Sequence, residues 1–275
     1  PQNSNLKAWY KLDASEVYNS TTTEWSVDNN QNPSAYPSSL DFNSASSAYI
    51  NLGQPSNFTN IGSSDFTQSC WIYQNSFTSG TDWHGLIYIG ARGSSQGHLF
   101  VKNNSGTPVI GCGIGDGATN SYGPSNETTY VVNNGQWYHI AYVKNSTSLK
   151  IYVNGNFVQS FSSTISPDPL NEDAYIGRGA TVGYDEFFDG RISNTQIFNT
   201  ALTDGTGGTV NQIETLYNNG NPLTDMSSFS SLVSWWKLDN TTTGIEDSKG
   251  SNNGTNNGAT EYPGFVNTLA GDSTG

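Results

Sequence analysis

No predicted strand of this 275-residue chain contains the matched pair of acidic side chains that retaining glycoside hydrolysis uses. Retaining hydrolysis needs two carboxyl groups about 5 Å apart, which on one strand means acids two or four positions apart. The candidates are Glu172-Asp173 and Asp185-Glu186, together with Asp189. Asp185 and Asp189 share a face only if the strand predicted from Phe187 begins as early as Asp185. The pattern therefore favours surface or metal-binding roles over catalysis.

Loop carboxylates are candidates for binding calcium, because this ion takes hard oxygen ligands from carboxylates and backbone carbonyls. The acids expected near loops are Asp82, Asp116, Asp185 and Glu186, and none of them has EF-hand spacing. These residues are candidate calcium ligands, and solvated surface acids are the alternative.

Aromatic side chains near predicted loops could stack on the apolar faces of sugar rings. Trp83 lies in Thr81-Asp82-Trp83-His84, where a carboxylate, an indole and an imidazole come together. We therefore predict a ligand contact at Trp83 and His84, and further contacts at Tyr122 and Tyr184. The alternative for Trp83 is a ring folded over the edge of the sheet, because large aromatic residues usually find partial burial.

The composition excludes several classes of protein. Charged residues make up only 12% of the chain, the net charge is −13, and the 10 Lys and Arg residues are scattered. A nucleic-acid-binding protein needs a basic stripe that these residues cannot form. No window approaches the roughly 20 apolar residues of a membrane span, so we expect no membrane insertion. For Cys70 and Cys112, buried free thiols are favoured over a disulfide.

Alternating apolar and polar residues predict many short strands with turn residues between them. The predicted strands are Leu6–Asp13, Ser39–Phe42, Tyr49–Leu52, Asp65–Gln74, Gly85–Ala91, His98–Lys102, Pro108–Gly113, Gln136–Asn145, Ser148–Val153, Asn156–Phe161, Ala174–Arg178, Phe187–Phe198 and Val233–Leu238. Asn154-Gly155 predicts a type I′ hairpin turn. One short helix is predicted over Val210–Tyr217, capped by Asp204 and closed by Gly220. Together these elements predict an all-β protein, an antiparallel β-sandwich of the jelly-roll type.

A near-repeat marks the two ends of the chain. The residues Trp9-Tyr10-Lys11-Leu12-Asp13 return as Trp235-Trp236-Lys237-Leu238-Asp239, and a Thr-rich stretch follows each copy. Repetition at long spacing usually means that one structural unit is used again. We therefore predict a jelly-roll domain over residues 1–225 and an extension over 226–275 that resembles the first strand and loop of a second domain. The stretch 240–258 is rich in Asn, Ser and Gly and predicts a loop or disorder.

Several stretches, taken together, resemble the laminin-G-like, concanavalin A-like jelly-roll family. They are Leu40–Asn43, Tyr49–Gly53, Phe66–Ile72, Gln136–Ala141, Leu149–Gly155, Tyr175–Gly177, Phe188–Ile192 and Ile197–Leu202. The resemblance covers about residues 6 to 222. One departure is Ser193-Asn194, which replaces an acidic pair usual in the family, so a metal site does not transfer directly.

This resemblance implies a non-catalytic, exposed binding or adhesion module that recognises a glycan or a cell-surface receptor. The alternative is a structural decoration or fibre protein of a phage particle, joined to other virion subunits through the C-terminal extension. A glycoside hydrolase of the same fold is a minor alternative. In each binding role, the expected location is extracellular or on a virion surface.

Overall fold

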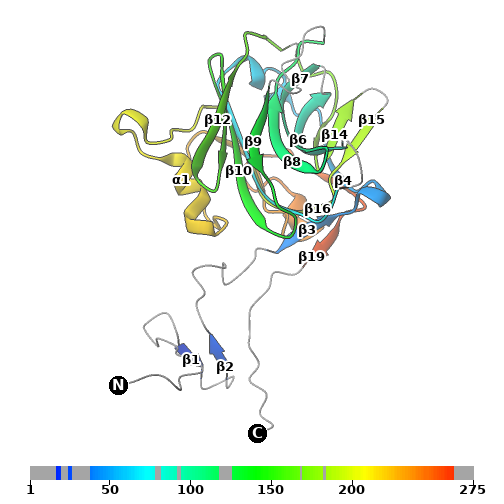
Figure 1. The fold of residues 1–275 in the computed structure, drawn as a ribbon, viewed down its shortest axis with the longest axis vertical. Helices are drawn as coiled ribbons and strands as arrows, with labels where there is room; N and C mark the ends of the chain where they lie inside the picture. Colours follow the sequence, from blue (N-terminus) through cyan, green and yellow to red (C-terminus); the bar gives the residue numbers. More distant parts are fainter. Residues whose placement is uncertain are drawn as a thin grey trace. The chain divides into compact units, whose positions relative to one another are not determined.

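The structure is a computed structural model that describes residues 17–19, 24–26, 38–77, 82–91, 94–117, 126–167, 169–181 and 184–262. Residues 37–263 form one compact unit (Figure 1). Separately, β1 (Val17–Asn19) and β2 (Glu24–Ser26) pair as antiparallel strands. The predicted strand Leu6–Asp13 lies outside the described residues. None of the helices in the described ranges has the length and apolar character that a membrane crossing requires.

Eight strands form the first sheet of the compact unit, and every neighbouring pair is antiparallel. The order is β12-β11-β10-β5-β16-β3-β19, with β17 paired to β16. The strands are β3 (Ser39–Phe42), β5 (Phe66–Gln74), β10 (Trp137–Asn145), β11 (Ser148–Val153), β12 (Asn156–Ser162), β16 (Gly190–Phe198), β17 (Leu232–Trp236) and β19 (Thr260–Tyr262). All of these except β19 were predicted from the alternation of residue types.

Seven strands form the second sheet, in the order β18-β4-β13-β6-β7-β8-β9. They are β4 (Tyr49–Gly53), β6 (Asp82–Ala91), β7 (Ser94–Asn104), β8 (Thr107–Gly113), β9 (Glu127–Val131), β13 (Ala174–Ile176) and β18 (Thr255–Asn257). The hairpin of β14 (Arg178–Thr181) and β15 (Tyr184–Phe187) lies against β6. A side chain on Gly85 of β6 would collide with the backbone of this hairpin, so the close approach requires glycine.

The two sheets pack face to face around one apolar core, and the predicted all-β antiparallel sandwich is confirmed. Ile72 and Ile140 of the first sheet and Ile87 and Leu99 of the second are all fully buried. Each such side chain contributes roughly 1.5–3 kcal/mol when it leaves water. The core also contains Cys70 and Cys112, both buried and free. The predicted free thiols are therefore confirmed, and burial raises the pKa of both.

The predicted hairpin turn between β11 and β12 is confirmed. Asn154 and Gly155 have φ values of 49° and 77°, which places both central residues in the left-handed region that a type I′ turn requires. The turn packs against the helix, because a Cβ on Gly155 would lie 3.1 Å from the ring of Tyr217. The hairpin and the helix are thus held together at this corner.

A second apolar layer covers the outer face of the first sheet. Ile213 and Leu216 of α1 (Gln212–Tyr217) pack there with Ala141, Val143 and Tyr152 of the sheet. The ring of Tyr217 stacks on Trp71, with the ring centroids 5.7 Å apart. Because this layer buries the sheet's outer face, β5 is buried on both faces for most of its length.

The helix differs from its prediction at both ends. It begins at Gln212, because the side chain of Asn211 accepts the N–H of Glu214 at 2.9 Å and caps the first turn. Val210 lies outside the helix and is 75% exposed. Asn218, with φ of 50°, ends the helix in place of Gly220.

The C-terminal copy of the repeat completes the sandwich, and the predicted domain boundary after residue 225 does not separate compact units. β17 pairs with β16, β18 pairs with β4, and β19 pairs with β3. Residues 226–262 therefore add strands to both sheets of the domain that residues 38–225 begin. The stretch 240–258, predicted as a loop or as disordered, is a loop that ends in β18.

A buried carboxylate holds this loop in place without apolar side chains. One Asp247 oxygen accepts the backbone N–H groups of Trp235, Lys249 and Gly250 at 2.9, 3.0 and 2.9 Å. The other accepts the N–H of Asn252 at 3.2 Å. Asp247 is only 7% exposed, so these four donors satisfy a carboxyl group that is largely removed from water. The sequence analysis did not predict this ordered loop, because it considered only the apolar surface that the stretch could bury.

We expect Asp247→Ala to lower the free energy of unfolding by about 2–3 kcal/mol, because it leaves buried N–H donors without an acceptor. Urea unfolding followed by circular dichroism measures the change. The matched control is Asp225→Ala, whose carboxylate is exposed and bonds only within its own turn to Ser227. Equal effects of the two substitutions would contradict the role given to Asp247.

Candidate functional site

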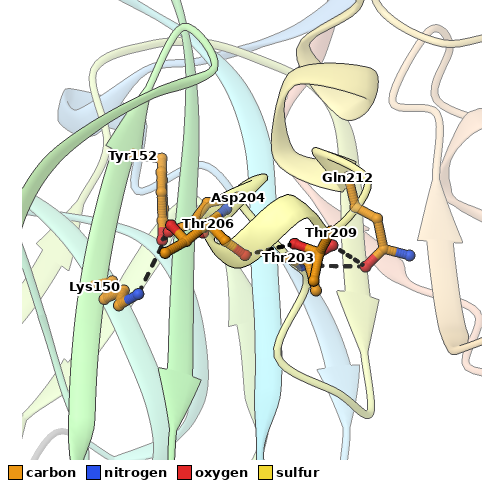
Figure 2. A network of polar contacts seen from close by, with 7 residues as sticks. All are labelled: Lys150, Tyr152, Thr203, Asp204, Thr206, Thr209 and Gln212. Carbon is orange, nitrogen blue, oxygen red and sulfur yellow. Dashed lines mark hydrogen bonds and ion pairs between the residues drawn. The ribbon is translucent and has the colours of Figure 1, made fainter.

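A polar network joins the β11–β12 hairpin to the loop after β16 (Figure 2). Lys150 and Tyr152 lie two positions apart on β11, so both side chains point to the same face of the sheet. Asp204 lies in the loop that follows Leu202 and meets them there. The Tyr152 hydroxyl donates to Asp204 Oδ2 at 2.6 Å, and Lys150 Nζ donates to the same oxygen at 3.4 Å.

The network fixes the charge of Asp204. Hydrogen bonds from Thr206 and Tyr152, followed by the nearby Lys150 ammonium, hold the pKa of Asp204 well below its usual range. Burial and the Asp204 carboxylate raise the pKa of Tyr152. At neutral pH the site therefore presents a carboxylate and a neutral phenol, with the Lys150 side chain beside them.

The loop that carries Asp204 is closed by its own side chains (Figure 2). Thr203 donates to Gln212 Oε1 from both its N–H and its hydroxyl, each at 3.1 Å. Thr209 Oγ1 donates to the Thr206 carbonyl at 3.1 Å. A β-bridge between Asp204 and Asn211 closes the base of the loop. These bonds tie the loop to the start of α1.

Two cavities open beside this network, and Phe157 lines both. The first, of about 430 Å³, is lined by Lys150, Tyr152, Gly155, Asn156, Phe157, Asp204, Thr206 and Asn211. The second, of about 500 Å³, is lined by Thr129, Tyr130, Val153, Asn154, Asn156, Phe157 and Val158. The two cavities share Asn156 and Phe157 as lining residues, and we call them together the Phe157 groove.

The ring of Phe157 is 54% exposed, although large apolar side chains are normally buried. It lies on the edge strand β12 opposite Tyr152, and the two rings meet edge to face with centroids 5.7 Å apart. Buried Tyr152 thus supports the exposed ring from one side. An exposed aromatic ring beside fixed polar groups offers a small ligand both an apolar contact surface and hydrogen-bond partners.

The groove offers binding groups and only one carboxylate. Of the lining residues, Asp204 alone is acidic. Its lowered pKa keeps it ionised at neutral pH, where a general acid must hold a proton. The arrangement can therefore accept and donate hydrogen bonds, but it lacks the second carboxyl group that glycoside hydrolysis uses.

The predicted contacts Trp83 and His84 lie elsewhere, on β6. His84 is 3% exposed, stacks on Phe77 with centroids 4.5 Å apart and bonds Gln74 at 3.0 Å, so it packs inside the domain. Trp83 is partly exposed, packs on Phe100 with centroids 4.6 Å apart, and has Lys102 Nζ 4.5 Å from its ring centre. Tyr122 and the side chain of Tyr184 lie outside the described residues.

The four predicted calcium ligands are described only in part. The side chains of Asp82 and Asp185 lie outside the described residues, and Asp116 is partly exposed. Glu186 is 6% exposed and accepts the Tyr88 hydroxyl at 3.1 Å. In the part of the chain that the structure describes, no group of three or more His, Cys, Asp or Glu residues could hold a metal. The calcium site stays a prediction.

Sequence reasoning missed Lys150, Tyr152, Asn156, Phe157 and Asp204. Phe157 is the one of these with a visible signal, since it directly follows the Asn-Gly turn and Asn156 on the second strand of the hairpin. Asp204 is 52 positions away from Tyr152, and only the packing of the outer layer brings them together.

Comparisons with known proteins agree with the fold. Residues 43–206, more than half of the chain, match the family model described as the concanavalin A-like lectin/glucanases superfamily. A candidate carbohydrate-binding protein from Bacteroides ovatus is 22% identical over 84% of this chain, with a TM-score of 0.58. A heptameric SAP-like pentraxin from Limulus polyphemus is 15% identical over 84% of this chain and 96% of its own, with a TM-score of 0.53.

The match spans only 61% of the Bacteroides ovatus protein. A search of curated proteins finds no match. At these identities the two solved structures support the fold alone, while the family model covers the chain from β4 to β16. The chain is therefore a member of the concanavalin A-like lectin/glucanase superfamily.

Proposed function

We propose that this chain is a non-catalytic binding module that holds a glycan in the Phe157 groove. The observation that carries the proposal is an exposed aromatic ring that lines two cavities, the first of which is lined mainly by polar side chains. A sugar ring has an apolar C–H face and a rim of hydroxyl groups. Phe157 matches the face, and Asn156, Asp204 and Lys150 match the rim.

The fixed polar groups of the groove support binding to uncharged sugars. Their positions are set before a ligand arrives, because Tyr152 and Thr206 already hold Asp204. Preorganised groups lose less conformational entropy on binding, and affinity rises accordingly. The net charge of −13 disfavours anionic partners and leaves neutral glycans as the fitting class.

The single carboxylate in the groove supports a binding role over hydrolysis. The alternative role, a structural decoration of a phage particle, would need a surface that joins other subunits. The C-terminal extension was expected to bind those subunits. In the structure its residues 232–262 instead pair with β16, β4 and β3 of the same sandwich. We therefore favour a glycan or glycosylated receptor as the partner, met outside the cell or on a virion surface.

We expect Phe157→Ala to weaken glycan binding by about tenfold, because an aromatic contact is worth roughly 0.5–1.5 kcal/mol beyond the area it buries. A glycan array selects the ligand, and isothermal titration calorimetry measures its affinity. Phe157→Tyr should retain binding, since it keeps the ring. The matched control Val210→Ala removes another exposed apolar side chain and should change nothing.

The array is run with calcium and again with a chelator. Lys150 lies beside the only acidic group of the groove, which disfavours a cation there, so we expect binding at this site to survive chelation. Loss of binding on chelation would instead support the predicted calcium ligands. Silence on both arrays, or full binding by Phe157→Ala, would contradict the proposal.

The lowered pKa of Asp204 predicts a flat pH dependence of binding. The carboxylate is fully ionised above its ordinary pKa of about 4, and its contribution is lost only as the pH falls below that value. We therefore expect constant affinity from about pH 5 to pH 8. Asp204→Asn should weaken binding equally across this range. Affinity that halves or doubles near pH 6 would show that another group controls the site.

A further inference from the structure

β17 pairs with one edge of β16, and this edge determines which side chains of the paired segment are buried. The buried side chains of the occupying segment are Leu232, Ser234, Trp235, Trp236 and Leu238. The residues at the same places in the first copy of the repeat are Leu6, Ala8, Trp9, Tyr10 and Leu12. Every buried place thus has an apolar or small residue in both copies. The one exposed place between Leu232 and Leu238 has lysine in both copies, Lys237 and Lys11.

The polar requirements of this edge also fit both copies. Asn194 Oδ1 accepts the indole N–H of Trp235 at 2.5 Å, and its backbone N–H donates to the Lys237 carbonyl at 2.8 Å. Trp9 offers the same indole donor, and any residue at position 11 offers the same carbonyl. Ser193-Asn194, the departure from the usual acidic pair, therefore recognises features that the two copies share.

The geometry allows the first copy to reach this edge within its own chain. Ser193 Oγ lies 3.4 Å from the Lys237 carbonyl oxygen and 3.0 Å from that of Ser38. The end of the occupying segment is therefore adjacent to the start of β3. If Leu6–Asp13 took this place, residues 13–37 would join two neighbouring points, a span far shorter than the reach of such a length of chain.

Two residues of the loop that follows β17, Asn252 and Asp247, favour the second copy. Asn252 donates to Ser234 Oγ at 2.7 Å and accepts the Trp236 indole N–H at 2.8 Å, and Ala8 and Tyr10 cannot repeat both bonds. The Asp247 clamp on the N–H of Trp235 also comes from the loop that follows the second copy. The first copy therefore fits the edge with fewer bonds.

We propose that this edge of β16 is a strand-acceptor site for either copy, and that Leu6–Asp13 of the same chain fills it when Leu232–Asp239 is withdrawn. The exchange keeps the sandwich closed while it frees the second copy. A freed second copy carries the residues that this acceptor edge selects, so it suits a second domain of the same kind.

The test uses the full chain and two substitutions at matching places. Trp236→Asp puts a charge where a side chain is fully buried, and so expels the second copy. We expect this variant to remain folded, with its melting temperature lowered by about 5–10 °C, because the first copy replaces the second. Tyr10→Asp alone should change the melting temperature by less than about 2 °C. The double variant should lose cooperative unfolding.

A disulfide shows which segment occupies the edge. Ile197 pairs with Ser234, the place of Ala8 in the first copy. Ile197→Cys with Ser234→Cys should cross-link in the otherwise unchanged chain. Ile197→Cys with Ala8→Cys should cross-link only in the Trp236→Asp background. Mass spectrometry identifies the linked peptides, and Cys70 and Cys112 are too buried to interfere.

Several outcomes would overturn the proposal. One is that Trp236→Asp unfolds the protein by itself, since the first copy would then have failed to replace the second. Another is that Tyr10→Asp adds nothing in the Trp236→Asp background. A cross-link from Ala8→Cys that forms only between chains, and increases with protein concentration, would assign the edge to a second copy of the chain.

Discussion

The edge of β16 that faces away from β5 must be paired, and the domain depends on how this is done. An unpaired strand edge exposes N–H and C=O groups that would otherwise seek another chain. β3 covers one half of this edge and β17 covers the other. Ser193 bonds carbonyls from both segments where they meet. Two parts of the chain separated by almost the whole domain thus close one strand.

This closure also supports the candidate binding site. Leu232 and Trp235 of β17 pack in the outer layer with Leu202 and Ile213, which flank the loop that carries Asp204. The same layer buries Tyr152, and Tyr152 bonds Asp204 and contacts the exposed ring of Phe157. Strand pairing therefore positions a layer, the layer positions a loop, and the loop completes a groove. A substitution in β17 is therefore expected to alter the groove through the packing of the outer layer, without contacting the groove itself.

Sequence patterns predicted most of the fold but little of the site. Alternation identified the long strands, and Asn154-Gly155 identified its turn, because both signals are local. The role of the C-terminal segment depended on β16, a partner distant in sequence, and on the four bonds of Asp247. The candidate site likewise joins Tyr152 to Asp204 across 52 positions. His84 carried a plausible local motif, yet its strand buries it.

The most direct test of the account is to map a bound glycan on the protein by nuclear magnetic resonance. A glycan chosen from an array is titrated into the isotopically labelled chain, and the shifts of the backbone amides are followed. Binding in the Phe157 groove predicts that the largest changes fall on Asn154–Val158 and Thr203–Gln212, two segments that contribute lining residues to it. Changes centred on Trp83 and its neighbours on β6 and β7 would contradict it, and would place recognition where the sequence first suggested.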